Sequence, residues 1–275
     1  TPVVSSAASD VYKRQPVWHL EDGLLRSVAK GRKHPPLALL VDELGVHFDA
    51  TAPSRIEQLI AAPITVTEAN RARALQRLWC EQRLSKVNPP REAEAPQEPY
   101  VLVVDQSAGD RSIALGLADA SCFQRMLKAA LQDHPDRTVV VKVHPDVISG
   151  RSRGHFTAED LAHPRVRLSA DGGHPARLLE RARAVYVVTS QMGFEALLWG
   201  RPVHCFGMPF YGGWGLTHDR CDAPARRRQG ASLEALVHAV LVGACRCIDP
   251  QRHQPCRIET LMGAIGLQRL SLIHI

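Results

Sequence analysis

An apolar stretch that runs into two hydroxyl side chains and then a helix is the feature that most constrains this chain. Residues 184–188 (AVYVV) have the β-branched and aromatic composition of a strand buried on both faces. Thr189 and Ser190 follow directly, residues 193–199 are typical of a helix, and residues 203–206 are typical of the next strand. Because the first N–H groups of a helix attract anions and the hydroxyls add donors, this junction predicts a phosphate-binding site.

The same alternation of strand and helix continues on both sides of this junction. Strands are expected over residues 100–104, 139–143, 184–188 and 203–206, and helices over 120–133, 176–183, 193–199 and 232–242. Such alternation is typical of a parallel sheet with helices on both faces. We therefore predict an α/β fold whose ligand site lies at the carboxyl ends of the strands.

The sequence also predicts two domains joined by a linker. Residues 16–86 are expected to form a partial first domain, with a hairpin between residues 37–41 and 46–48. Residues 87–99 are rich in proline and glutamate and have few apolar side chains, which predicts a linker outside any core. Residues 100–256 are expected to form the second domain.

The two ends of the chain have a different origin from the rest. Residues 10–15 (DVYKRQ) can be coded by GAT GTG TAT AAG AGA CAG, and the reverse complement of that string translates as LSLIHI, which is residues 270–275. One DNA adaptor read in both senses explains this relation. We therefore expect residues 1–15 and 270–275 to be adaptor-derived, and we exclude them from fold reasoning.

Composition and charge exclude few classes of function. The chain has 45% hydrophobic and 23% charged residues, the balance of a soluble globular protein, and no apolar stretch near the roughly 20 residues that span a bilayer. Its formal charge of +6 favours anionic partners such as nucleotides or phosphorylated substrates without indicating nucleic acid. Residues 226–228, all arginine, are expected to lie on a solvated face or at most to contact an anionic lipid or glycan. The seven cysteines lack zinc-site spacing.

Two clusters of polar side chains follow predicted strands of the second domain. The first contains Lys142, His144 and Pro145, and its imidazole and ammonium groups can neutralise a phosphate; the alternative is a histidine that binds a backbone carbonyl. The second contains Asp110, which Gly109 places at the rim of a tight turn. Its carboxylate is a candidate nucleophile or base, or else a helix N-cap.

Two further clusters complete the candidates. Glu21 and Asp22 are adjacent acids before Gly23, a pair suited to acid/base chemistry, although acids on a surface are common. Residues 209–217 (PFYGGWGLT) combine aromatic residues with glycines, which predicts a lid, a stacking surface or a packed corner of the fold. Because ligands bind at the carboxyl ends of parallel strands, we expect the clusters to converge on one crevice.

Together these motifs resemble a known family. The residues that carry the resemblance are LEDGLLRS (20–27), PPLALLVDELGVHFDATAPS (35–54), VDQSAGDRS (104–112), VKVHPDVISGRSRGH (141–155) and VYVVTSQMGFEALLWGRPVHCFGMPFYGGWGLT (185–217). The chain resembles capsule polysaccharide biosynthesis proteins of the KpsC type, which are retaining β-Kdo glycosyltransferases. Its motifs look more like those of the N-terminal of the family's two transferase modules.

The resemblance implies a fold and a set of partners. The fold is GT-B-like, with two Rossmann-like domains of which the N-terminal one is truncated here. The donor is CMP-β-Kdo, a nucleotide-activated 2-keto sugar acid, and no metal ion or other cofactor is required. The acceptor is a lipid-linked Kdo of the phosphatidylglycerol type. The implied location is cytoplasmic and peripheral at the inner membrane, with capsule assembly proteins as further partners and no nucleic acid.

The resemblance also implies roles for individual residues. Asp110 matches the nucleophile that forms a glycosyl-enzyme, and Glu21 or Asp22 matches the acid/base group. A cation such as Lys142 or Arg26 is expected near the sugar carboxylate. The donor-binding residues are then Lys142, His144, Pro145, Thr189, Ser190, Glu195, Gln106 and Ser112, with Glu195 placed at the ribose hydroxyls.

Two other functions agree with the same residues. One is a GT-B relative that uses a UDP-sugar as transferase or epimerase, against which the His-Pro pair argues. The other is a non-catalytic, degenerate module, against which the acids at positions 21, 22 and 110 argue.

Overall fold

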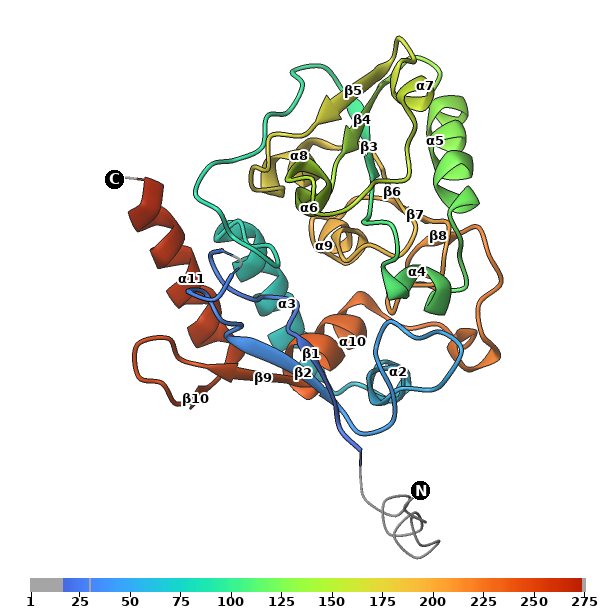
Figure 1. Cartoon of the computed structure of the whole chain (residues 1–275). Coiled ribbons are helices and arrows are strands. Elements are labelled where there is room, and N and C mark those ends of the chain that lie inside the picture. The colour runs from blue at the N-terminus through green and yellow to red at the C-terminus, as the bar shows by residue number, and fades with distance from the viewer. Residues whose placement is uncertain (1–16, 30, 274–275) are drawn as a thin grey trace, which may run out of the picture.

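The computed structural model describes residues 17–29 and 31–273 (Figure 1). The expected adaptor-derived residues 1–15 therefore lie outside the described residues, as do residues 274–275. Residues 270–273 form the last turn of α11 (Ile258–Ile273). None of the described helices has the length and apolar character needed to cross a bilayer.

The molecule has two lobes, each built on one sheet. A six-stranded, all-parallel sheet forms the centre of the second lobe. Its strands are β3 (Tyr100–Val104), β4 (Thr138–Lys142), β5 (Val166–Ser169), β6 (Val185–Val187), β7 (Val203–Cys205) and β8 (His218–Asp219), in the spatial order β5-β4-β3-β6-β7-β8. This is the order of a dinucleotide-binding Rossmann sheet, so the predicted α/β fold is confirmed. The strand order reverses between β3 and β6, and a crevice opens at that point.

Helices cover both faces of this sheet (Figure 1). They are α4 (Arg111–Leu115), α5 (Ser121–Asp133), α6 (Pro145–Ile148), α7 (Ala158–Leu161), α8 (Ala176–Arg181) and α9 (Met192–Leu198). Successive strand residues alternate between two cores: Val101 and Val103 pack with Phe123 of α5, whereas Leu102 and Val104 belong to the core that contains Phe194 of α9. The central strands β3, β4 and β6 are buried on both faces, which explains why they are almost wholly apolar.

The first lobe is built on a four-stranded antiparallel sheet. Its strands are β1 (His19–Asp22), β2 (Ala38–Asp42), β9 (Cys245–Ile248) and β10 (Pro255–Cys256), in that spatial order. The expected hairpin is wrong, because residues 46–48 form a turn and β2 pairs with β1 and β9 instead. The expected domain end at residue 256 also differs from the structure, since β9 and β10 complete the sheet of the first lobe. Residues 16–86 supply no parallel, Rossmann-like sheet within the described part.

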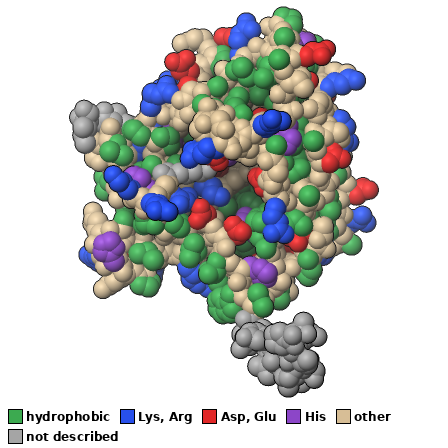
Figure 2. Space-filling view, viewed as in Figure 1, with side chains coloured by type: hydrophobic (Ala, Val, Ile, Leu, Met, Phe, Trp, Pro, Cys, Tyr) green, Lys and Arg blue, Asp and Glu red, His purple; other side chains and the backbone are tan. Residues whose placement is uncertain are grey.

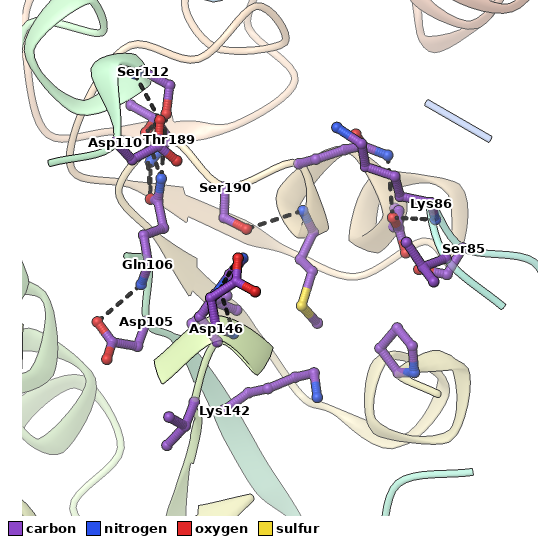
Figure 3. A pocket seen from close by; sticks show the side chains of 18 of the residues that line it. Ser85, Lys86, Asp105, Gln106, Asp110, Ser112, Lys142, Asp146, Thr189 and Ser190 are labelled. Carbon is purple, nitrogen blue, oxygen red and sulfur yellow. Dashed lines mark hydrogen bonds and ion pairs between the residues drawn. The ribbon is translucent and has the colours of Figure 1, made fainter. Parts of the chain in front are cut away.

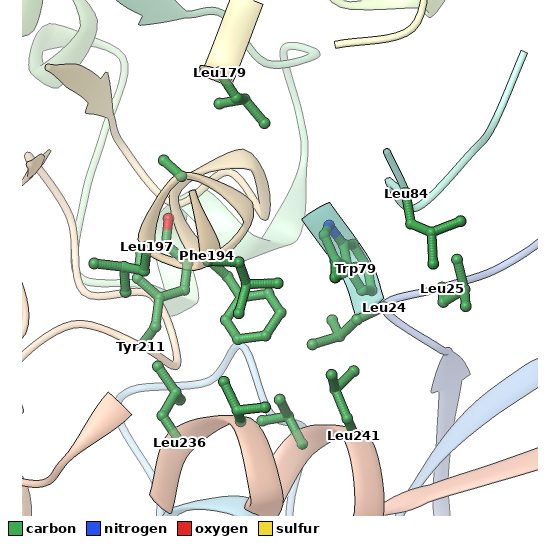
Figure 4. Close-up of a cluster of buried hydrophobic side chains, with 14 of the residues drawn as sticks. Leu24, Leu25, Trp79, Leu84, Leu179, Phe194, Leu197, Tyr211, Leu236 and Leu241 are labelled. Atoms are coloured by element: carbon green, nitrogen blue, oxygen red, sulfur yellow. The ribbon is translucent and has the colours of Figure 1, made fainter. Parts of the chain in front are cut away.

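Four helices and one hydrophobic core join the lobes. These helices are α2 (Arg55–Ala61), α3 (Val66–Glu81), α10 (Leu233–His238) with its π-helical extension η2 (Ala239–Gly243), and α11. The short strand β8 is followed by a 3-10 turn, η1 (Ala225–Arg227), before the chain returns to α10. Figure 4 shows Trp79 of α3, Phe194 of α9 and Leu236 of α10 packed in one cluster. The lobes therefore share a core rather than meeting only at a surface.

Residues 87–99 connect the lobes but are packed against them, so the expectation of a linker outside any core is wrong. Asn88 and Ala93 are fully buried, and the Asn88 side chain binds the Ser27 and Ser85 carbonyls. Glu92 forms ion pairs with Arg83 (2.9 Å) and Arg269 (2.6 Å). Polar contacts, which hydrophobicity patterns do not register, hold this segment.

The two arginines of η1 form an ionic clamp between the lobes. The expected solvated face is therefore wrong for Arg227, which is buried, and for Arg226, which is half-buried, whereas Arg228 is exposed. Arg227 Nε and Arg226 Nε each lie 2.6 Å from an oxygen of Glu57 in α2. Arg227 is fully buried and also donates from Nη1 to the carbonyls of Pro209 and Gly212, at 2.6 and 3.1 Å. The clamp thus fixes the loop after β7 against the first lobe.

Candidate functional site

A cavity of about 570 Å³ lies between the two lobes, and Figure 2 shows the molecule hollowed there with acidic and basic side chains at the edge. One wall is formed by residues after β3, β4 and β6, at the point where the strand order reverses. The opposite wall comes from β1, from the loop after β2 and from residues 85–87. This is the crevice expected for an open parallel sheet.

The predicted clusters converge on this inter-lobe cavity. The predicted residues that line it are Glu21, Gln106, Asp110, Ser112, Lys142, His144, Thr189, Ser190 and Glu195. Pro209 and Phe210 from the glycine-rich loop line it as well. Pro145 is the first residue of α6, directly after His144. Side chains from three strand ends and from the other lobe therefore face one space.

Glu21 and Asp22, the two adjacent acids, lie on opposite faces of strand β1. Successive residues of a strand point to opposite faces, and only Glu21 lines the cavity. Asp22 instead accepts a hydrogen bond from Arg26 Nε at 2.7 Å, so this acid and Arg26 are paired with each other away from the cavity wall. A Cβ on Gly23 would lie 2.6 Å from the Ala38 Cβ, which explains why the acids are followed by glycine.

Asp110 is a helix N-cap that also lines the cavity, so the N-cap alternative is confirmed and a catalytic role stays a prediction. Its Oδ1 accepts from the Ser112 N–H at 2.9 Å at the start of α4, and Gly109 before it has a φ of +83°. No described residue donates a hydrogen bond to Oδ2. The cap thus orients the carboxylate while leaving one oxygen for chemistry.

His144, two residues after β4, is held in place by contacts to its Nδ1. Its Nδ1 accepts from the Asp146 backbone N–H at 3.1 Å and lies 3.1 Å from Ser107 Oγ. An Nδ1 that accepts leaves the proton of the neutral ring on Nε2. His144 and Asp110 also share an adjoining outer hollow of about 510 Å³, which Arg151 and Ser152 help to line.

A hydrogen-bonded network spans the switch point between β3 and β6 (Figure 3). Gln106 Oε1 accepts from the Thr189 N–H at 2.9 Å, and Gln106 Nε2 donates to Thr189 Oγ1 at 3.0 Å. Ser112 Oγ lies 3.1 Å from the same hydroxyl. These predicted donor-binding side chains therefore bind one another across the two strand ends.

Lys142 and Glu195, two buried residues of the cavity, have shifted pKa values. Burial lowers the pKa of Lys142, although Asp171 and Glu195 act in the opposite direction. Burial raises the pKa of Glu195 to about 7, in spite of hydrogen bonds from the Ser85 side chain, from the Lys86 N–H (3.2 Å) and from Gln191 (3.3 Å). Glu195 Oε2 is buried, with almost no accessible surface.

Replacing Glu195 by Gln should stabilise the protein at neutral pH. Because the folded-state pKa of about 7 exceeds the ordinary value of 4.5, the unfolded chain loses this proton first, so stability falls as pH rises between the two values. Glu195→Gln removes that loss and should unfold with a free energy higher by up to about 3 kcal/mol near pH 8, with no gain near pH 4. Urea unfolding across this pH range measures the difference.

Glu234→Gln is a control that should change the free energy of unfolding in the opposite direction. A backbone N–H and Arg73 lower the pKa of Glu234, so its replacement should cost stability at neutral pH. A Glu195→Gln variant that is less stable than the wild type near pH 8 contradicts a buried, hard-to-ionise carboxyl group.

Sequence reasoning missed several residues of the cavity, chiefly on the first lobe. His47 and Phe48 follow β2, Ser85 and Lys86 follow α3, and Arg151 follows α6. His47 and Phe48 lie in the segment that was expected to be a strand. The only available signal was their presence in the long motif 35–54 that carries the family resemblance.

No group of three or more histidine, cysteine, aspartate or glutamate side chains among residues 17–29 and 31–273 is arranged to hold a metal ion. The expectation that the reaction needs no metal or other cofactor stays a prediction.

Comparison with known proteins identifies the family. The capsule polysaccharide biosynthesis protein family matches over residues 5–88 and 67–246. The chain is 43% identical over 250 residues to the capsule polysaccharide modification protein LipA of Neisseria meningitidis serogroup B, covering 86% of this chain and 35% of LipA. It is 36% identical over 243 residues to the lipopolysaccharide-processing protein LpsZ of Rhizobium meliloti, covering 85% of this chain and 55% of LpsZ. The chain thus spans about a third to a half of these relatives.

Two solved structures have the same fold. The β-Kdo 2,4 transferase of Thermosulfurimonas dismutans KpsC superposes with a TM-score of 0.85 at 37% identity, over 96% of this chain and 85% of that one. The β-Kdo 2,7 transferase of the same KpsC has a TM-score of 0.73 at 26% identity, over 92% of this chain and 78% of that one. The chain therefore belongs to the capsule polysaccharide biosynthesis protein family.

Proposed function

We propose that this chain is a glycosyltransferase module that moves Kdo from CMP-β-Kdo onto a lipid-linked Kdo acceptor with retention of configuration. One observation carries the proposal: the carboxylates of Asp110 and Glu21 and the imidazole of His144, which come from two different lobes, line the same cavity. The similarity to the two KpsC Kdo transferases supports the substrate class.

The donor would occupy the second-lobe wall of the cavity. Its phosphate lies between His144, two residues after the end of β4, and Ser190, which follows β6. The carboxylate of the sugar is neutralised by Lys142, and Glu195, which also lines the cavity, binds the ribose hydroxyls. Cations and N–H donors then hold the departing phosphate, which makes CMP a good leaving group without a metal.

Two displacements give the retained configuration. An oxygen of Asp110 attacks the anomeric carbon of Kdo while the bond from that carbon to the phosphate oxygen breaks, so CMP leaves with the electron pair. A hydroxyl of the acceptor then attacks the same carbon, its proton passes to Glu21, and the Asp110 carboxylate is released. Each step inverts the centre once, so the β configuration of the donor returns in the product.

The remaining parts of the proposal concern the setting of the reaction. The acceptor is a lipid of the phosphatidylglycerol type that carries Kdo, so the module works at the cytoplasmic side of the inner membrane as a peripheral protein. Contacts with capsule assembly proteins belong to the same proposal, and no nucleic acid takes part. The family membership and the net charge of +6 support an anionic, membrane-bound substrate.

Nucleotide binding tests the donor. CMP present at about 100 times its dissociation constant should raise the free energy of unfolding by about 2.7 kcal/mol, since it binds the folded state alone. UDP at the same concentration should have little effect, and thermal unfolding with each nucleotide measures the difference. Stronger stabilisation by UDP would favour a UDP-sugar enzyme, and no stabilisation by either nucleotide would favour a non-catalytic module.

A further inference from the structure

A histidine on the first-lobe wall of the cavity is not used by the chemistry proposed above. His47 lies in the loop between β2 and α2 and lines the cavity together with Phe48. We infer, on the basis of the proposed function, that His47 recognises the acceptor sugar: a ring nitrogen hydrogen-bonds a sugar hydroxyl while neighbouring aromatic rings hold the imidazole in place.

The loop that carries His47 is fixed by a buried carboxylate. Asp42, at the end of β2, accepts from the N–H groups of Leu44 (2.8 Å) and Gly45 (3.1 Å). It also accepts from the N–H groups of Arg55 (3.0 Å) and Ile56 (3.2 Å) in the first turn of α2. Both ends of the loop are thereby tied to one side chain, so the position of His47 is set before any ligand binds.

Aromatic side chains from both lobes hold the imidazole ring. Its centroid lies 5.2 Å from that of Phe48 and 5.5 Å from that of Phe210, and both contacts are edge-to-face. Phe210 follows Pro209, whose carbonyl is held by Arg227 of the ionic clamp. The ring is therefore oriented by packing, which leaves its two nitrogens for other partners.

The imidazole is neutral and its polar atoms are available. Burial, together with the positive charge of Lys86, lowers the pKa of His47 to about 3. No described residue forms a hydrogen bond with either ring nitrogen. A neutral imidazole presents one N–H donor and one nitrogen acceptor, which is the complement of a hydroxyl group rather than of a phosphate.

The position of His47 in the cavity favours a contact with the acceptor rather than with the donor. The groups assigned to the donor phosphate and ribose all follow β4 and β6 in the second lobe, whereas His47 shares the first-lobe wall with Glu21. Glu21 is the group proposed to receive the proton of the attacking hydroxyl. Lys86, whose charge acts on His47, adds a cation to this wall. A sugar that carries hydroxyls and a carboxylate fits this combination.

Binding of separate probes for the two walls tests the inference. The full chain is titrated with CMP for the donor wall and with a methyl β-glycoside of Kdo for the acceptor wall, and calorimetry gives each dissociation constant. His47→Phe keeps an aromatic ring between Phe48 and Phe210 but removes both nitrogens. It should weaken binding of the glycoside by about 3- to 10-fold, the effect of one hydrogen bond, and leave CMP binding unchanged.

Two further variants make the result specific. His47→Gln restores an N–H donor and an oxygen acceptor without a ring, so it should bind the glycoside better than His47→Phe. His34→Ala removes an exposed histidine of the same lobe that does not line the cavity, and it should match the wild type. Thermal unfolding of each variant separates lost binding from lost folding.

The possible outcomes distinguish the inference from the proposed function. The inference is overturned if His47→Phe binds the glycoside as tightly as the wild type, if it loses CMP and glycoside affinity by the same factor, or if the wild type does not bind the glycoside. If the wild type binds the glycoside but not CMP, and His47→Phe binds the glycoside more weakly, the proposed donor is wrong and the inference about His47 stands.

Discussion

Replacing Asp110 by Asn should abolish sugar transfer while leaving the fold and CMP binding intact. Asparagine is as good an N-cap as aspartate, so the hydrogen bond from the Ser112 N–H to the side chain at position 110 is kept. The amide oxygen, however, is a poor nucleophile, and loss of a covalent nucleophile typically lowers the turnover rate by roughly 10⁴-fold or more. Transfer from CMP-Kdo to a Kdo-terminated acceptor measures the rate, and calorimetry measures CMP affinity.

Asp119→Asn provides a matched control for this variant. Asp119 also accepts a backbone N–H at a helix start, that of Ser121 at 2.8 Å, but it does not line the cavity. Its replacement should leave the rate unchanged. If Asp110→Asn retains normal transfer, Asp110 is only a cap and the double displacement through this residue is wrong.

Replacing Glu57 by Gln should produce the largest loss of stability of any variant considered. The change leaves the guanidinium of Arg227, which is fully buried, without its counter-charge. Removing one partner of a buried ion pair costs about 3–5 kcal/mol, because the remaining charge stays desolvated. Gln can still accept at the helix start, so the capping contact with Ser54 is largely kept. Urea unfolding measures the change in the free energy of unfolding.

Glu43→Gln supplies the comparison with an exposed pair. Glu43 binds Arg55 at 2.5 Å on the surface, where both side chains are more than a third exposed. An exposed pair contributes about 0–1 kcal/mol, so this variant should lose little stability. Equal losses in the two variants would show that the clamp between η1 and α2 does not join the lobes energetically.

Much of the second lobe could be predicted because its signals are local. The strand over residues 100–104 is wholly apolar since it is buried on both faces, and the helix that follows Thr189 and Ser190 begins at Met192, one residue before the predicted start. Convergence of His144, Asp110 and Ser190 followed from one rule, that parallel strands end at the same edge of a sheet. The strands β5 and β8, at the two edges, were not predicted, because each is short and partly exposed.

The first lobe could not be predicted to the same degree, because its contacts join distant segments. β2 pairs with β9, some 200 residues later, and no local pattern records that pairing. Glu57 illustrates the limit in a single residue. Its capping pair with Ser54 is a local pattern three residues apart, whereas its neutralisation of two arginines of the other lobe is not. His47 was missed for the same reason, since its importance depends on Phe210.

The return of the chain to β9 and β10 affects how substrates reach the cavity. The backbone passes from one lobe to the other through residues 87–99 and passes back before α10, so the halves are tethered at two places. If the two lobes moved far apart, Trp79 would lose its contact with Phe194 and Arg227 its ion pair with Glu57. We therefore expect ligands to enter without such a movement, and Arg151 lines both the cavity and the outer hollow that adjoins it.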